Sequence, residues 1–430
     1  MKSRWNEEEA GEFLGDPLAL RVYTSRLLGA DPELVLHGGG NTSVKVRERT
    51  FFGDEEELIY VKGSGWDLGT IEAAGFAPVR MAALLKMAEL SELGDAEMVK
   101  QQRAAMTDPA APTPSIEAIL HAVIPFKYVD HTHANAVVAV TNHADGEARV
   151  EEVYGKRVLV VPYVMPGFIL AKTIYEMTRG ADWGAIDGMI LMNHGIFTFA
   201  DDAQESYEAM VRLVDEAEVW LKAKAGGDGL VEGQAEEDLL GLAALRRGVA
   251  GKRGCAVVAR YDGSAEAVGY SGLEGIEDVA TRGPLTPDHT IRTKRIPGVV
   301  GEDIDGDLGR FADTYAAYFA RHSSGEQTML TADPRWVVWK GKGVVAFGAN
   351  EKEAGIVGDI AEHTYKTVQL AEATGGWEAL GEKEIFDIEY WELEQAKLKT
   401  AGAKRAFEGK VAIVTGSAAG IGFACAETLA

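Results

Sequence analysis

Apolar residues recur at helical spacing in several stretches of the first half of the chain. They predict helices at residues 17–28, 78–90, 114–123 and 203–225, with Ser115 as the N-cap of the third. Short apolar runs that end at turns predict strands at residues 36–46, 58–61, 126–133, 157–163 and 188–193. Helices and strands intermixed in this way indicate an α/β domain.

A change in composition divides the chain after the long helix. Gly226-Gly227-Asp228-Gly229 has the composition of a flexible joint, so we place a first domain at residues 1–225. Residues 230–400 form a second α/β segment, with a helix predicted at 239–250 and strands at 336–339 and 344–347. Residues 401–430 form a third, separate region.

The length, composition and charge of the chain indicate how many domains it has and which binding partners are disfavoured. A chain of 430 residues with 46% hydrophobic and 26% charged residues is expected to form two or more globular domains. Its formal charge of -24 disfavours nucleic acids and anionic membranes, so a small anionic substrate needs a local cationic or N–H-lined pocket. Cys255 and Cys425 show no CxxC spacing, and no segment has the pattern of a leader or membrane span, so we expect a cytoplasmic protein.

Three histidines are candidate metal ligands. His131 and His133 are separated by one residue at the end of a predicted strand, where alternation turns both imidazoles to one face. His194 also ends an apolar strand, and three neutral nitrogens leave a coordination position open for substrate. An isolated HxH is often incidental, and His143 is the strongest rival among the other histidines. The run from Thr286 to His289 stays unassigned, because Pro-Asp is also an ordinary turn signal.

A carboxylate and two glycine-rich loops complete the candidate chemistry. Glu117 lies at the start of the predicted helix, where it is either an exposed carboxylate or an acid/base group beside a metal. The loops Gly38-Gly39-Gly40-Asn41-Thr42-Ser43 and Lys62-Gly63-Ser64-Gly65 offer backbone N–H groups for a phosphate. Tight turns that bind nothing would use the same residues.

Together, HGGGNTS, KGSG, PSIE, HTH and NHG stand in the order typical of class II aldolases, and the first 225 residues resemble that family. The resemblance implies a three-layer domain with a central, mostly antiparallel sheet, and a homo-oligomer in which a neighbouring subunit completes the site. It implies Zn²⁺ on His131, His133 and His194, with Glu117 as the catalytic acid/base. It implies phosphate binding by Asn41, Gly63, Ser64 and Ser115. Many members carry two hydroxyl residues before the glutamate, whereas Ile116 stands here, and related epimerases usually have aspartate in place of Glu117.

The last 21 residues of the chain have the pattern expected at the start of a nucleotide-binding domain. Residues 410–422 read as a strand, a TGxxxGxG turn and a helix start, which resembles the short-chain dehydrogenase family. In that family Gly416, Gly420 and Gly422 would lie against the pyrophosphate of NAD. The downstream catalytic residues of that family do not occur before Ala430, so we expect a truncated Rossmann start, no dehydrogenase activity in this chain and NAD binding only in a longer form.

The order of these regions resembles the N-terminal part of bifunctional rhamnulose-1-phosphate aldolase/short-chain dehydrogenases. That resemblance implies zinc-dependent retro-aldol cleavage of L-rhamnulose 1-phosphate to dihydroxyacetone phosphate and L-lactaldehyde. Two alternatives remain open. One is a sugar-phosphate epimerase or dehydratase on the same fold, and the other is a metal-free binding module, because a fold alone does not establish a function.

Overall fold

The computed structural model describes residues 1–399 and 407–429, which divide into two compact units. The first unit comprises Met1–Gly229, Leu285–Asp288 and Thr367–Glu384, and the second comprises Leu230–Pro284, His289–Lys366 and Ile385–Ala430. Two short segments from the second half of the sequence therefore belong to the first unit. The predicted boundary at residues 400 and 401 lies outside the described residues.

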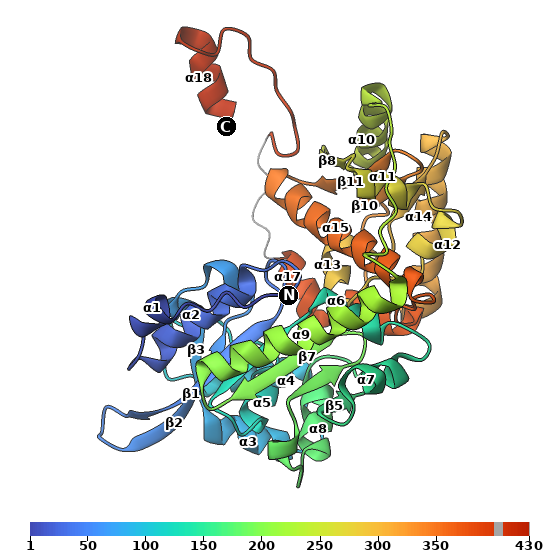
Figure 1. The fold of residues 1–430 in the computed structure, drawn as a ribbon. Coiled ribbons are helices and arrows are strands. Elements are labelled where there is room, and N and C mark those ends of the chain that lie inside the picture. The colour runs from blue at the N-terminus through green and yellow to red at the C-terminus, as the bar shows by residue number, and fades with distance from the viewer. Residues whose placement is uncertain (400–406, 430) are drawn as a thin grey trace. The chain divides into compact units, whose positions relative to one another are not determined.

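A seven-stranded sheet forms the centre of the first unit (Figure 1). Its strands, in the order β3-β2-β1-β4-β7-β6-β5, are β1 Asn41–Arg49, β2 Glu55–Lys62, β3 Phe76–Arg80, β4 Tyr128–Thr132, β5 Val158–Val161, β6 Gly188–Leu191 and β7 Gly195–Ala200. Only β5 and β6 pair in parallel among these neighbours, so the sheet is mixed and mostly antiparallel.

Helices cover both faces of this sheet. They are α1 Glu7–Gly11, α2 Pro17–Gly29, α3 Met81–Glu89, α4 Asp95–Ala104, α5 Ala118–Val123, α6 Asn135–Thr141, α7 Gly146–Tyr154, α8 Phe168–Met177 and α9 Ala203–Ala225. On one face α2 and α9 pack on β1 and β4, and on the other α3, α5 and α8 pack over a separate apolar core. The predicted α/β fold with three layers is therefore the fold of this unit.

Two predicted helices begin later than their apolar patterns suggest. The pattern at 78–90 is divided between β3 and α3, because Pro78 lies in β3 opposite Tyr60. This strand lies at the edge of the sheet, where a residue without an N–H group is tolerated.

The prediction of Ser115 as a helix N-cap is also wrong. Helix α5 begins at Ala118, and Glu117 occupies the N-cap position. Ser115 Oγ instead accepts a hydrogen bond from the Glu117 amide.

The second unit is built around a four-stranded sheet. Its strands, in the order β8-β11-β10-β9, are β8 Val258–Asp262, β9 Gly298–Val300, β10 Trp336–Trp339 and β11 Gly343–Gly348. The helices after residue 230 are α10 Leu239–Arg253, α11 Ala265–Ser271, α12 Ile276–Ala280, α13 Thr290–Thr293, α14 Ile304–His322, α15 Glu351–Ala373, α16 Glu382–Glu389, α17 Glu392–Lys399 and α18 Gly420–Leu429. Helices α10 and α14 bury Leu245 and Leu308 against this sheet.

The C-terminal region differs from its prediction. Helix α18 forms, but residues 411–414 belong to no strand among the described residues, and the side chain of Ile413 is 93% exposed. An extended segment becomes a strand only when a neighbour accepts and donates its backbone hydrogen bonds. The glycine turn itself is formed, since Gly416 and Gly420 have positive φ and a Cβ at Gly422 would lie 2.4 Å from the Gly416 carbonyl oxygen.

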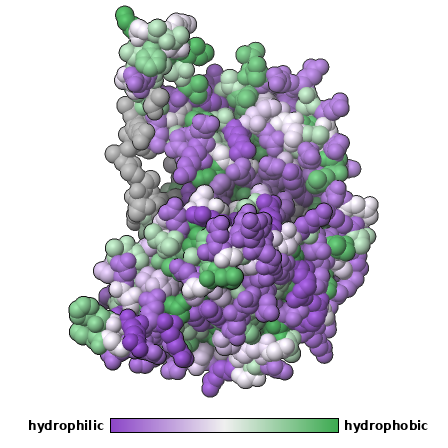
Figure 2. All heavy atoms as spheres, turned by 60° about the vertical axis from the view of Figure 1, so that its left-hand side comes forward, coloured by the Kyte–Doolittle hydropathy of each residue, from purple (hydrophilic) through white to green (hydrophobic). Residues whose placement is uncertain are grey.

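The hydropathy of the surface is consistent with the high proportion of charged residues in the chain. Figure 2 shows a face on which hydrophilic residues prevail and hydrophobic residues occur in small, separate groups. Among the described helices, none combines the length and the apolar character that crossing a bilayer requires.

Candidate metal centre

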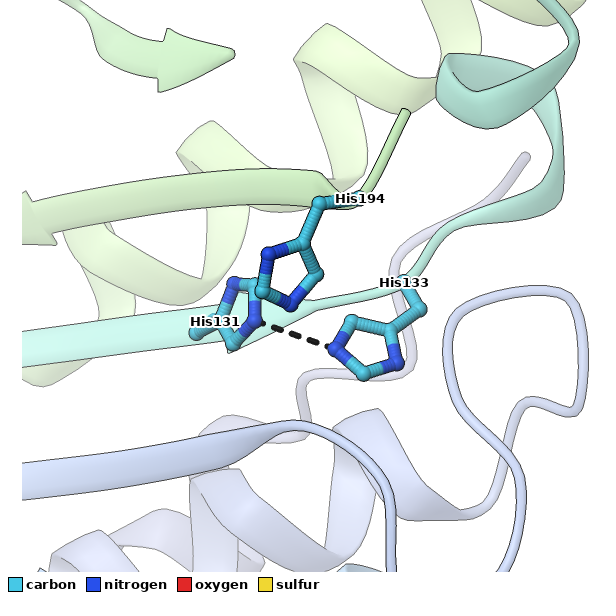
Figure 3. Close-up of side chains that lie close together, drawn as sticks. All are labelled: His131, His133 and His194. Carbon is cyan, nitrogen blue, oxygen red and sulfur yellow. Dashed lines mark hydrogen bonds between the residues drawn. The ribbon is translucent and has the colours of Figure 1, made fainter. Parts of the chain in front are cut away.

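Three histidines meet where β4, β6 and β7 end or begin (Figure 3). His131 lies in β4, His133 directly follows that strand, and His194 lies in the turn between β6 and β7. Their ring centroids are 4.9–5.1 Å apart, and the Nε2 atoms of His131 and His133 are separated by 3.1 Å. One donor atom from each ring lies within 4.8 Å of the others, so the structure brings all three predicted ligands together.

A strained turn directs His194 toward the other two rings. Asn193 has a φ of 58°, and its amide and side chain donate hydrogen bonds to Thr141 Oγ1 and Asn142 Oδ1. Asparagine tolerates this left-handed conformation better than most residues do. A Cβ on Gly195 would lie 2.2 Å from the Thr132 carbonyl oxygen, so glycine is needed where β7 starts beside the end of β4. The left-handed turn explains the asparagine before His194, and the close approach to β4 explains the glycine after it.

The ring of His131 is fixed from two sides. Its Nδ1 donates a hydrogen bond to the Ile196 carbonyl at 3.0 Å, and its face stacks on Phe197 with 4.0 Å between centroids. A hydrogen on Nδ1 leaves the lone pair on Nε2, the atom that faces His133. On the opposite face of β4, Asp130 forms a fully buried ion pair with Arg21 at 2.6 Å.

The histidines have the protonation that metal binding requires, with one exception. Burial lowers the pKa of His131 and that of His133 to about 3, so both rings are neutral at pH 7. Burial also acts to lower the pKa of His194, but its hydrogen bond to Asp288 and the charges of Asp288 and Glu117 outweigh burial and raise that pKa. Buried, convergent, neutral imidazoles are suited to a divalent transition metal.

Metal affinity is therefore expected to rise with pH through the raised pKa of His194 and then to level off. A proton on His194 competes with the ion, whereas His131 and His133 have none to release above about pH 4. Below the pKa of His194, affinity should fall by up to about tenfold per pH unit. Calorimetric titration with Zn²⁺ in buffers of different ionisation enthalpy should detect release of one proton per ion. An affinity that does not change between pH 5 and 8 would contradict this assignment.

Glu117 lies beside the histidines and is almost fully buried. Its Oε2 is 3.7 Å from His131 Nε2 and accepts a hydrogen bond of 2.5 Å from Asn41 Nδ2. Its Oε1 is buried and has no hydrogen-bond partner among the described residues. A buried carboxylate oxygen without a partner is costly unless a ligand or a proton transfer uses it.

A chain of hydrogen bonds that sequence reasoning missed holds this carboxylate. Asn41 pairs with His131 in the β1–β4 ladder, and directly opposed residues project to the same face. The Asn41 Oδ1 accepts a hydrogen bond from His121 Nε2, and His121 Nδ1 accepts one from Ser43 Oγ at 2.8 Å. Burial lowers the pKa of His121 well below its usual range, so this ring is neutral. The strand register was the missing signal, and a single sequence does not reveal it.

The two glycine loops and the PSIE segment lie against one another. Lys62 donates hydrogen bonds of 2.9 Å to the carbonyls of Gly38 and Gly40, and Ser115 N donates to the Lys62 carbonyl. The amides of Gly63 and Ser64 donate to the carbonyls of Gly75 and Thr113, so they are engaged within the protein. The Ser64 side chain is exposed and Ser115 is buried beside Glu117.

The rival histidine lies elsewhere in the first unit. His143 Nε2 accepts a hydrogen bond from Arg149 Nη1 at 3.1 Å, and burial together with the charge of Arg149 lowers its pKa to about 4. Among the described residues, the group that could hold a metal comprises His131, His133 and His194 and does not include it.

Comparisons with known proteins find similarity to class II aldolase domains. The class II aldolase and adducin N-terminal domain matches residues 20–221, and the second domain of class II aldolases matches residues 236–398. The chain is also similar to the uncharacterized oxidoreductase YuxG of Bacillus subtilis (strain 168), with 30% identity over 451 residues. That alignment covers 100% of this chain and 65% of the relative, so the chain spans about two thirds of the relative's length.

Two solved structures illustrate the similarity. The N-terminal class II aldolase domain of a conserved protein from Thermoplasma acidophilum is 40% identical and covers 51% of this chain and 99% of its own, with a TM-score of 0.47. The L-fuculose-1-phosphate aldolase from Thermus thermophilus is 19% identical and covers 47% of this chain and 95% of its own, with a TM-score of 0.30. Residues 20–221 and 236–398 are therefore similar to the first and second domains of class II aldolases.

Proposed function

We propose that this chain is a zinc-dependent lyase that cleaves L-rhamnulose 1-phosphate to dihydroxyacetone phosphate and L-lactaldehyde. The observation that carries this proposal is the convergence of His131, His133 and His194 beside a buried carboxylate. This carboxylate is Glu117, whose Oε1 has no hydrogen-bond partner among the described residues. The substrate identity and the zinc come from the motif resemblance and are part of the proposal. When bound, the ion would supply Lewis acidity that stabilises negative charge on substrate oxygens.

Glu117 is the group that handles the proton on carbon. Cleavage transfers the proton of the C4 hydroxyl to the Glu117 carboxylate, breaks the C3–C4 bond, forms the aldehyde carbonyl at C4 and leaves the electron pair in an enediolate over C2 and C3. We assign Glu117 Oε1 to deliver a proton to C3, while Asn41 holds Oε2 in place. The low exposure of this carboxylate excludes water that would otherwise weaken the electrostatic interaction.

The phosphate is proposed to lie among Asn41, Gly63, Ser64 and Ser115. Ser115 Oγ accepts a hydrogen bond from the Glu117 amide, which leaves its hydroxyl hydrogen to donate to an anion. Lys62 adds a positive charge beside both glycine loops. This local charge supplies the attraction that a chain of net charge -24 otherwise lacks for a sugar phosphate.

The C-terminal glycines belong to a separate proposal. Gly416 precedes α18, Gly420 and Gly422 lie in its first turn, and we propose that all three contact the pyrophosphate of NAD in a longer protein. The aldolase activity proposed here does not depend on them.

Product analysis tests the proposed function directly. The full chain, supplied with Zn²⁺ and L-rhamnulose 1-phosphate, should yield dihydroxyacetone phosphate and L-lactaldehyde in equal amounts on chromatography. Chelation should stop the reaction and added Zn²⁺ should restore it. L-Fuculose 1-phosphate, which differs in configuration, is the matched substrate control. A phosphorylated epimer or a dehydrated sugar without any lactaldehyde would reject aldol cleavage.

A further inference from the structure

A short segment far along the sequence reaches the histidine site. Leu285–Asp288 belongs to the first unit, although the residues on either side of it belong to the second. The Leu285 carbonyl accepts a hydrogen bond of 2.8 Å from Asn142 Nδ2, and Asn142 Oδ1 in turn accepts one from Asn193. Asn142 therefore connects this segment to the turn that carries His194.

The side chain at the end of this segment points at the candidate metal ligands. Asp288 Oδ2 lies 3.2 Å from His133 Nε2 and 3.3 Å from His194 Nε2. Its amide donates a hydrogen bond to Thr286 Oγ1, and Leu285 and Thr286 are buried, so the backbone of the segment is anchored. The carboxylate is thus held at the site by its own segment.

The nitrogen atoms that Asp288 faces decide its role. A carboxylate that only orients a metal-bound histidine accepts a hydrogen bond from the ring nitrogen turned away from the metal, as the Ile196 carbonyl does for His131 Nδ1. Asp288 instead faces Nε2 of His133 and of His194, and His133 Nε2 is also the atom 3.1 Å from His131 Nε2. Its oxygen therefore lies beside ring nitrogens of two of the three histidines.

Three separations among these donors agree with a small, four-coordinate ion. Neighbouring donors of a tetrahedral ion with bonds of about 2.0 Å lie about 3.3 Å apart. The separations of 3.1, 3.2 and 3.3 Å fit that value. Glu117 is less suited to be the fourth donor, because its Oε2 is 3.7 Å from His131 Nε2 and is bonded to Asn41.

We propose that Asp288 is a fourth ligand of the divalent ion, contributed by Leu285–Asp288 to the site of the three histidines. This inference rests on the metal site of the proposed function and adds a residue from the stretch matched by the second-domain family model.

Cobalt titration of the metal-free full chain tests this assignment without an activity measurement. Replacing Asp288 by alanine should weaken Co²⁺ binding at least tenfold and should change the visible absorption of the bound ion, because water replaces a carboxylate in its coordination shell. The matched control is Asp278→Ala, which removes the same charge from an exposed carboxylate paired with Arg282. This control should bind Co²⁺ with wild-type affinity and spectrum.

Folding is checked separately. Thermal unfolding of the metal-free variants by circular dichroism identifies a variant that does not fold, and the nearly isosteric Asp288→Asn then replaces Asp288→Ala. Wild-type affinity and spectrum in the folded variant would overturn the proposal. So would weaker binding with an unchanged spectrum, which indicates a supporting hydrogen bond. Neither result depends on aldol cleavage, so a chain that binds Co²⁺ through Asp288 but releases no lactaldehyde refutes only the proposed function.

Discussion

Replacing His133 by alanine is expected to abolish metal binding and retro-aldol cleavage together. The change removes one of three convergent imidazoles and leaves His131 and His194 with two nitrogens for the ion. The charge that develops on substrate oxygens then has no Lewis acid, so kcat/KM should fall by at least about 10³-fold. Elemental analysis after dialysis measures the bound zinc, and release of lactaldehyde measures the reaction.

A buried histidine outside the site supplies the control. The side chain of His133 is 10% exposed and His143 is 9% exposed, but His143 bonds to Arg149 and does not face the other rings. His143→Ala should therefore retain zinc and activity. Equal zinc and activity in His133→Ala would remove His133 from the site. Loss of both in both variants would show that a buried histidine in this unit is needed for the fold itself.

The sequence allows good prediction of elements whose signals are local. The helix predicted at 203–225 agrees with α9 at both ends, because Asp202 accepts hydrogen bonds from the first turn and Gly226 ends the helix in the left-handed conformation. The strand predicted at 336–339 is β10, with four buried residues in a row. Caps and uninterrupted apolar runs act within a few residues and are visible in a single sequence.

Elements that depend on distant partners were predicted less well. Whether the pattern at 78–90 starts as helix or strand depends on pairing with β2, which no local signal reports. The same argument applies to residues 411–414, whose apolar composition predicts a strand that finds no neighbour among the described residues. Backbone pairing between strands depends on the tertiary structure, so composition alone shows only that a segment is able to form a strand.

The residues of the candidate site also differ in whether a local sequence signal predicts them. His131, His133, His194 and Glu117 were predicted because each stands in a short motif at the beginning or the end of a predicted element. Asn41 was predicted near a phosphate, but its bond to Glu117 follows from the register of β1 against β4. Asp288 comes from a part of the sequence 94 residues beyond His194, so only the fold shows that its carboxylate lies beside the histidines.

Replacing Glu117 by glutamine is expected to lower kcat by about 10²–10⁴-fold while zinc stays bound, because general acid–base catalysis contributes about that much. The glutamine oxygen can still accept the hydrogen bond from Asn41 Nδ2, so the position of the side chain and the stability of the fold should change little. The amide cannot deliver or remove a proton at carbon. Steady-state kinetics and elemental analysis of the same preparation measure both quantities.

Exchange of a proton on dihydroxyacetone phosphate separates this role of Glu117 from an effect on binding. In D₂O the wild-type protein should incorporate deuterium at C3, as followed by NMR, because Glu117 transfers that proton in both directions. Glu117→Gln should lose this exchange, and Glu117→Asp should keep part of it, since the carboxylate remains but is one methylene shorter. Glu147→Gln, which removes a charge from an exposed residue at the start of α7, is the matched control. Wild-type exchange in Glu117→Gln would assign the proton transfer to another group, even if cleavage were slow.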